Sequence, residues 1–258
     1  MKLAANLTLM FTEVPLKERF QAAANAGFNG VEILMPEGIP ADELALAARE
    51  AGVEIVLFNN SMGDLLTGGP GISGVPGMQD IFRESIEESR ILATAFGAPC
   101  MHIGPSMIPE GSTREECLNV YAENLKYATT VLSRIGTKVL LEPMNTKDMP
   151  CALLTTLSQA LEIIDEIDPA NLGLQFDFYH VYMNGFDIAE ALVDVINRVD
   201  HIQFSDSPGR CEPGGGKIDF QPALDVVRNS RYEGWLGAEY RPTTKTEDTL
   251  SWLPQFGG

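Results

Sequence analysis

The sequence predicts an α/β protein with one domain, residues 1–258, folded as a (β/α)8 TIM barrel, that is, a parallel eight-stranded barrel ringed by helices. Short apolar runs alternate with helical patterns from one end of the chain to the other. Parallel strands produce such runs because both of their faces are buried. The chain has 258 residues, 45% of them apolar. That length suits one barrel of about 250 residues better than two ordinary domains.

Eight β-then-α units follow one another, and their connections carry no hairpin signal. This pattern favours parallel strands joined by right-handed crossovers. An open doubly wound sheet is the structural alternative, but no expected strand is followed by G-x-G-x-x-G. The expected strands are Leu3–Leu9, Gly30–Leu34, Glu54–Asn59, Cys100–Gly104, Lys138–Pro143, Leu172–Asp177, His201–Ser205 and Trp235–Tyr240. The expected helices are Leu16–Ala26, Ala41–Ala51, Met78–Phe96, Arg114–Arg134, Thr156–Ile167, Ile188–Asn197, Phe220–Asn229 and Glu247–Leu253.

One connection, residues 60–77, is unusually long and contains Gly68-Gly69-Pro70-Gly71. Loops of this length in compact domains are usually functional or mobile. We expect a lid over the barrel mouth. A surface loop without a function is the main alternative, and a phosphate-binding loop is a minor one.

The charge balance restricts the partners. Acidic residues outnumber basic ones 36 to 18, which gives a net charge of −18. This works against nucleic acid or an anionic membrane as a partner, but a metal site can still attract a small anionic substrate. No apolar run approaches the roughly 20 residues of a membrane span. We therefore expect a cytoplasmic protein acting on a small molecule. Barrels of this kind often associate, so a homo-oligomer is an open expectation.

Polar side chains stand at the C-terminal ends of the last four expected strands, where barrel enzymes carry their catalytic groups. They are Glu142, Asp177, Gln203 and Glu239, separated by 35, 26 and 36 positions. A single such residue could simply reach solvent or cap the next helix. Four of them converge on one barrel mouth, where three carboxylates repel one another unless a cation lies between them. Oxygen donors alone favour Mg²⁺ or Mn²⁺ over zinc or copper.

Two of these ligands also suit proton transfer. Glu142 and Glu239 belong to the fifth and eighth expected strands, so we expect them to face each other across the barrel mouth. A substrate that chelates the metal between them would present one carbon to each carboxylate. That arrangement suits proton abstraction alpha to a carbonyl, with the metal stabilising the enediolate oxygens.

Other polar residues lie near these ends. His180, in the expected loop three residues past Asp177, could hydrogen-bond a substrate oxygen or serve the structure alone. Arg210 could clamp a carboxylate through its planar guanidinium, or form a surface ion pair. His201 and Gln203 share a strand face by the period of two, so His201 is expected just behind the ligands.

Five segments of the chain resemble the hydroxypyruvate isomerase family of the xylose-isomerase-like barrels. They are Leu141-Glu142-Pro143-Met144-Asn145, Gln175-Phe176-Asp177-Phe178-Tyr179-His180, His201-Ile202-Gln203-Phe204-Ser205-Asp206, Arg210-Cys211-Glu212-Pro213-Gly214 and Gly237-Ala238-Glu239-Tyr240. The resemblance implies a metal held by the same four ligands, with Glu142 and Glu239 as the acid–base pair.

The resemblance also implies substrate contacts and a reaction. His180 and Arg210 match substrate-contacting positions of related ketose 3-epimerases, and Asn145 and Asp148 are carried over as further substrate residues. Those epimerases usually have histidine where this chain has Gln203. The implied reaction converts hydroxypyruvate to tartronate semialdehyde.

The alternatives within this superfamily are a 2-oxo-tetronate isomerase and a ketose 3-epimerase. More distant ones are a metal-dependent phosphodiesterase and a non-catalytic sugar-binding barrel. The loop at residues 60–77 departs from the family pattern at Leu65 and Gly69-Pro70, which leaves the exact substrate open.

Overall fold

The structure is a computed structural model and describes residues 1–34, 36, 38–168 and 170–257. It confirms the predicted fold, because eight strands form a closed parallel barrel in the order β1 to β8. The strands are β1 (Lys2–Asn6), β2 (Gly30–Ile33), β3 (Glu54–Asn59), β4 (Cys100–His102), β5 (Lys138–Leu141), β6 (Leu172–Asp177), β7 (Val199–Phe204) and β8 (Trp235–Ala238).

Helices follow the strands along the chain. The α-helices are α1 (Leu16–Asn25), α2 (Ala41–Ala51), α3 (Gln79–Phe96), α4 (Arg114–Leu132), α5 (Leu157–Ile167), α6 (Phe178–Met183), α7 (Ile188–Val195), α8 (Gln221–Asn229) and α9 (Leu253–Gly257). Short 3-10 helices are η1 (Leu65–Thr67), η2 (Ser133–Ile135), η3 (Ile196–Arg198) and η4 (Thr246–Thr249). None of the helices in the described residues is long and apolar enough to cross a membrane.

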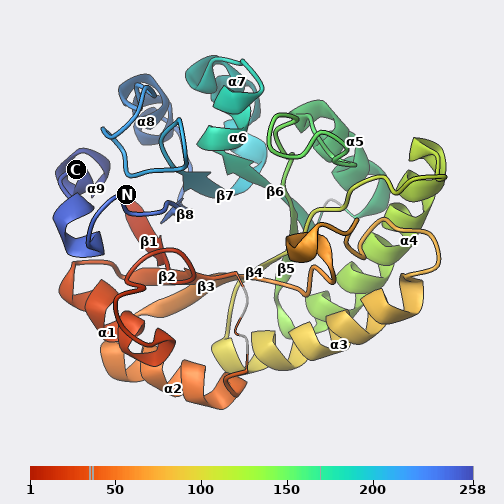
Figure 1. Ribbon diagram of the computed structural model, residues 1–258, viewed down its shortest axis with the longest axis horizontal. Helices are drawn as coiled ribbons and strands as arrows, with labels where there is room; N and C mark the ends of the chain where they lie inside the picture. Colours follow the sequence, from red (N-terminus) through yellow and green to blue (C-terminus); the bar gives the residue numbers. More distant parts are fainter. Residues whose placement is uncertain (35, 37, 169, 258) are drawn as a thin grey trace. The chain divides into compact units, whose positions relative to one another are not determined.

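The chain divides into two compact units, residues 1–56 with 176–258 and residues 57–175. In the first unit α1 packs on α2, α7 packs on α8, and α9 contacts β1, so both chain ends belong to this unit (Figure 1). In the second unit the long helices α3 and α4 lie side by side (Figure 1). The single domain over residues 1–258 stays a prediction, and residues 35, 37, 169 and 258 of that span lie outside the described residues.

Local chemistry explains where the helices begin and end. Gly97 follows α3 with a φ of 63°, in the left-handed region that side chains other than glycine rarely adopt. At the start of α4, Thr113 accepts a hydrogen bond from the backbone N–H of Glu116, whose side chain accepts one from the backbone N–H of Thr113. This reciprocal capping box satisfies backbone groups that a helix start leaves open.

Alternation along β7 separates the site from the hydrophobic core. Phe204 belongs to an aromatic cluster, with its ring centroid 4.4 Å from that of Phe256 and 5.2 Å from that of Trp252. The neighbouring Gln203 projects to the opposite face, because successive strand side chains alternate. Packing of α9 on the barrel therefore fixes the strand that carries Gln203.

Most expected boundaries shift by no more than two residues, and three differences are larger. The helix expected over Glu247–Leu253 is instead η4 followed by α9, because Pro254 has no backbone N–H and is tolerated only in a helix's first turn. The first strand ends at Asn6, whose side-chain oxygen accepts a hydrogen bond from the N–H of Thr8 at 3.1 Å and starts a turn. Helix α6 was not expected, because its sequence Phe-Tyr-His-Val-Tyr-Met has no polar stripe.

The expected lid is largely packed. The side chain of Ser73 donates to the Gly104 carbonyl at 2.8 Å, and Asn124 donates to the Ser73 carbonyl at 2.9 Å. Ile72, which precedes Ser73, is buried. Exposure concentrates at the tip, where Leu66 of η1 is 66% exposed. A closing lid at residues 60–77 stays a prediction, and the packing restricts it to this tip.

Candidate active site

Asp177 is the last residue of β6 and the N-cap of α6. Its Oδ1 accepts a hydrogen bond from the N–H of Tyr179 at 2.7 Å. One turn further, His180 Nε2 lies 3.5 Å from Asp177 Oδ2, and both side chains are buried. His180 therefore belongs to a helix instead of the expected loop. The short helix α6 turns the imidazole back toward the end of β6.

Arg210 joins two buried carboxylates in the loop after β7. Its Nη2 lies 3.0 Å from Asp177 Oδ2 and also contacts Glu239 Oε2. The guanidinium lies over the ring of Tyr179, 4.9 Å from its centroid. A surface ion pair does not describe this contact, because the carboxylates are 1% and 9% exposed. Asp177 and Glu239 thus share one cationic nitrogen, as like charges in a buried place require.

The loop that carries Arg210 is organised by Asp206. This side chain is fully buried, and its carboxylate accepts five backbone hydrogen bonds at 2.7 to 3.0 Å. A Cβ at Gly216 would lie 2.4 Å from Asp206 Oδ1, so glycine is needed there. Sequence reasoning gave Asp206 no role, although a carboxylate before a glycine-rich loop is a signal for such a turn. The donors are the N–H groups of Ser207, Gly214, Gly216, Lys217 and Ile218.

Glu239 directly follows β8 and is buried. Burial raises its pKa to about 7. The positive charge of Arg210 opposes this shift, while the negative charges of Asp177 and Glu32 add to it. A carboxyl group with a pKa near neutrality can both accept and return a proton.

Gln203 and His201 both contact Glu32. Gln203 Nε2 donates to Glu32 Oε2 at 2.7 Å, and His201 Nε2 lies 2.6 Å from Glu32 Oε1. This confirms that the two β7 residues share a face. Sequence reasoning missed Glu32. The available signal was a carboxylate inside an apolar strand with no local partner.

The remaining predicted residues follow β5 in the second unit. Glu142 is 7% exposed, and its Oε2 lies 3.7 Å from His102 Nε2. Asn145 Nδ2 donates to Asp148 Oδ2 at 2.9 Å, while Asn145 Oδ1 accepts the N–H of Asp148 at 2.8 Å. The two are thus brought together in one turn. Their contact with substrate stays a prediction, as do the assigned roles of Glu142.

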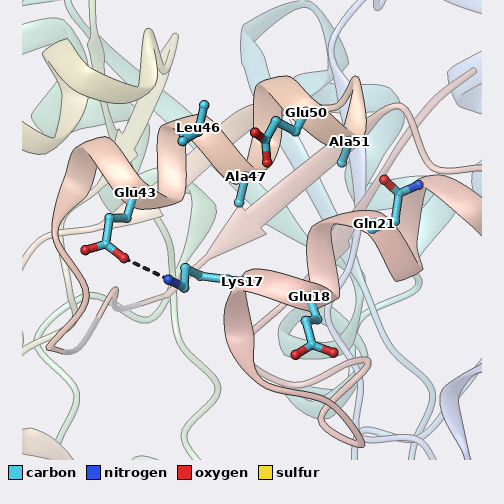
Figure 2. A pocket seen from close by; sticks show the side chains of 8 residues that line it. All are labelled: Lys17, Glu18, Gln21, Glu43, Leu46, Ala47, Glu50 and Ala51. Atoms are coloured by element: carbon cyan, nitrogen blue, oxygen red, sulfur yellow. Dashed lines mark hydrogen bonds and ion pairs between the residues drawn. The ribbon is translucent and has the colours of Figure 1, made fainter.

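A separate hollow of about 300 Å³ lies between α1 and α2 (Figure 2). Figure 2 shows Lys17 pointing toward Glu43, with Nζ 2.8 Å from Oε2. This ion pair is half exposed, so it adds little to stability. No predicted site residue lines the hollow. Its lining residues are Lys17, Glu18, Gln21, Glu43, Leu46, Ala47, Glu50 and Ala51.

Comparison with known proteins identifies relatives over nearly the whole chain. A family model described as xylose isomerase-like TIM barrel matches residues 20–256. The chain is 36% identical to a 2-oxo-tetronate isomerase of Haemophilus influenzae and 33% identical to a hydroxypyruvate isomerase of Escherichia coli. Each alignment covers 99% of both chains. A solved structure titled AP endonuclease, family 2, from Brucella melitensis superposes with a TM-score of 0.93 at 34% identity, covering 99% of this chain and 98% of that one.

The chain therefore belongs to the xylose isomerase-like TIM barrel family. The resemblance inferred from the sequence segments is confirmed, and so is the enzyme class, isomerase. The particular substrate, the metal and the roles of single residues are matters of proposal.

Proposed function

We propose that this isomerase interconverts hydroxypyruvate and tartronate semialdehyde with the help of a divalent metal, Mg²⁺ or Mn²⁺. One observation carries the proposal: two buried carboxylates, Asp177 and Glu239, converge on a single nitrogen of Arg210. Their oxygens are close enough to share a cation. The names of the relatives support short 2-oxo acids as candidate substrates.

The donor chemistry fits such a metal. Asp177, Gln203 and Glu239 offer oxygen atoms, and hard divalent cations prefer oxygen ligands. Glu142, which directly follows β5, completes the proposed set as the pattern of polar strand ends in the sequence predicts. His180 is a further donor of suitable type, and its nitrogen would move the preference toward Mn²⁺. When bound, the cation would supply Lewis-acid stabilisation of negative charge on the substrate oxygens.

Proton transfer is assigned to the two glutamates. One carboxylate removes the proton from C3 of hydroxypyruvate; the electron pair of that C–H bond forms the C2–C3 double bond, and the π pair of the C2 carbonyl moves onto O2. The other glutamate, protonated at the start, delivers its proton to C2, while the C3 hydroxyl passes its proton to O2 and its oxygen becomes the aldehyde oxygen. Arg210 and His180 would orient the substrate carboxylate and hydroxyl, together with Asn145 and Asp148.

The runner-up is a 2-oxo-tetronate isomerase, favoured by the 36% identity to the H. influenzae relative. Its chemistry is the same proton transfer on a substrate one carbon longer. A ketose 3-epimerase differs by the carbon that receives the proton. Action on DNA is disfavoured, because a net charge of −18 repels phosphates.

A substrate panel tests the proposal. The purified protein is assayed with hydroxypyruvate, 2-oxo-tetronate and ketoses, after chelator treatment and with Mn²⁺ or Mg²⁺ restored. We expect hydroxypyruvate to give the highest kcat/KM, loss of turnover with chelator, and recovery with either cation. Higher kcat/KM on 2-oxo-tetronate would select the runner-up. Full turnover in chelator would reject the metal.

Two amide variants test the acid–base pair. Glu142→Gln and Glu239→Gln each remove one proton carrier and should lower kcat at least 1000-fold, while Tm stays near that of the parent. Glu43→Gln, which breaks only the exposed pair with Lys17, is the matched control. Near-normal turnover in either amide variant would reject the two-base mechanism.

A further inference from the structure

Glu32 lies at the centre of a buried hydrogen-bonded cluster. Its side chain is fully buried, although an ionised carboxylate is among the most costly groups to remove from water. Oε1 lies 2.6 Å from His201 Nε2. Oε2 accepts hydrogen bonds from Gln203 Nε2 at 2.7 Å and from Asn6 Nδ2 at 3.2 Å. Both carboxylate oxygens are thus bonded to side chains of other strands.

The barrel makes room for this carboxylate through a glycine. Gly237 of β8 pairs with Gln203 of β7, and a Cβ at Gly237 would lie 1.7 Å from Glu32 Oε1. Any side chain there would therefore displace Glu32 from the cluster. Gly237 does not have a left-handed φ, so its backbone conformation does not require glycine. Glycine is needed because Glu32 approaches the backbone so closely.

The hydrogen bond to Glu32 decides which atom Gln203 offers to the active site. An amide nitrogen donates and an amide oxygen accepts. With Nε2 held on the carboxylate, the planar amide directs Oε1 to the other side. The flipped amide would bring Oε1 to 2.7 Å from a carboxylate oxygen, and two acceptors at that distance repel.

We propose that Glu32 is a positioning residue that holds Gln203 with Oε1 presented as a metal ligand. The inference rests on the proposed metal site. Glu32 would not touch the metal. It would orient the ligand Gln203 through a hydrogen bond and in this way tune the affinity for the metal. Positioning Gln203 requires a hydrogen-bond acceptor at residue 32. The negative charge of Glu32 is not itself required.

Mn²⁺ titration of the purified, substrate-free protein tests the inference. Glu32→Leu keeps the volume but removes the acceptor, so the Kd for Mn²⁺ should rise about 10- to 100-fold. Glu32→Gln keeps a carbonyl oxygen that can accept from Gln203, so its Kd should stay within about threefold of the parent. Tm, measured in parallel, confirms that each variant is folded at the titration temperature.

A thermodynamic cycle makes the test independent of general destabilisation. On a Gln203→Ala background the ligand is absent, so adding Glu32→Leu should not raise the Kd further. Glu43→Gln, which breaks only the exposed ion pair with Lys17 between α1 and α2, is the control and should leave the Kd unchanged.

The outcomes are distinguishable. Equal loss in Glu32→Leu and Glu32→Gln would assign the effect to charge and overturn the positioning role. Parent-like affinity in Glu32→Leu, with only Tm lowered, would reduce Glu32 to a structural residue and overturn it too. Absence of Mn²⁺ binding by the parent would reject the proposed metal site, and with it the inference.

Discussion

Replacing Gly237 by alanine tests how closely the barrel interior is packed around Glu32. The new Cβ would lie 1.7 Å from Oε1 and 2.5 Å from the carboxyl carbon of Glu32, less than half to about two thirds of an ordinary contact. Glu32 must therefore move, or β8 must shift. Either movement breaks the contacts with His201 and Gln203, which are 2.6 and 2.7 Å long.

The magnitude follows from two contributions. Overpacking a filled interior costs about 1–3 kcal/mol. Weakening one or two hydrogen bonds to a buried charge adds about 1.5–3 kcal/mol. Because the structure around residue 237 relaxes in part, we expect the free energy of unfolding to fall by about 3–5 kcal/mol. For a chain of this size that loss lowers Tm by about 10 °C.

Thermal unfolding followed by circular dichroism provides the assay, with Gly257→Ala as the matched control. A Cβ at Gly257 would meet only Leu3 Cδ1, at 3.7 Å, an ordinary contact. The control should change Tm by about 2 °C or less. The reasoning would be refuted if Gly237→Ala unfolded within 2 °C of the parent, because the barrel would then absorb the methyl group without moving Glu32.

Three further predictions concern residues around the site and the chain ends. Arg210→Lys removes the planar guanidinium that joins Asp177 and Glu239, so KM for a carboxylate substrate should rise at least tenfold; an unchanged KM in steady-state assays would exclude Arg210 from substrate binding. Asp206→Ala removes the acceptor of five backbone N–H groups, and should lower the free energy of unfolding by about 3 kcal/mol in urea titration. Burial raises the pKa of Glu13, but hydrogen bonds from Thr246 outweigh it and leave that pKa below the ordinary value. The Thr246 contact therefore stabilises the protein above the unfolded pKa and is lost as pH falls through the folded one, so the stability deficit of Glu13→Gln should shrink from pH 7 to pH 3.

Much of the fold follows from local sequence. The apolar runs Glu54–Asn59 and Leu172–Asp177 have the boundaries that the structure gives them, because strands buried on both faces leave a clear pattern. Helix Ala41–Ala51 is also as predicted, since Gly52 adopts a φ of 72° and ends it. The period-two rule correctly placed His201 and Gln203 on one face.

Other features depend on neighbours that the sequence separates. Helix α6 lacks a polar stripe, since its first four residues are buried, so periodicity could not reveal it. The sequence left open whether Arg210 binds a carboxylate. The structure shows that it contacts two of them, because the loop around Asp206 holds it there, and the shape of that loop depends on backbone hydrogen bonds.

The sequence by itself determined the barrel, the family and the strands that carry Asp177 and Gln203 or lead into Glu239, because periodicity and strand ends are local properties. Only the tertiary structure decided that Glu32, 171 positions before Gln203, holds its amide. The stagger of the strands and the space left by Gly237 bring Glu32 and Gln203 together. Neither the stagger nor this space can be predicted from the periodicity of the sequence.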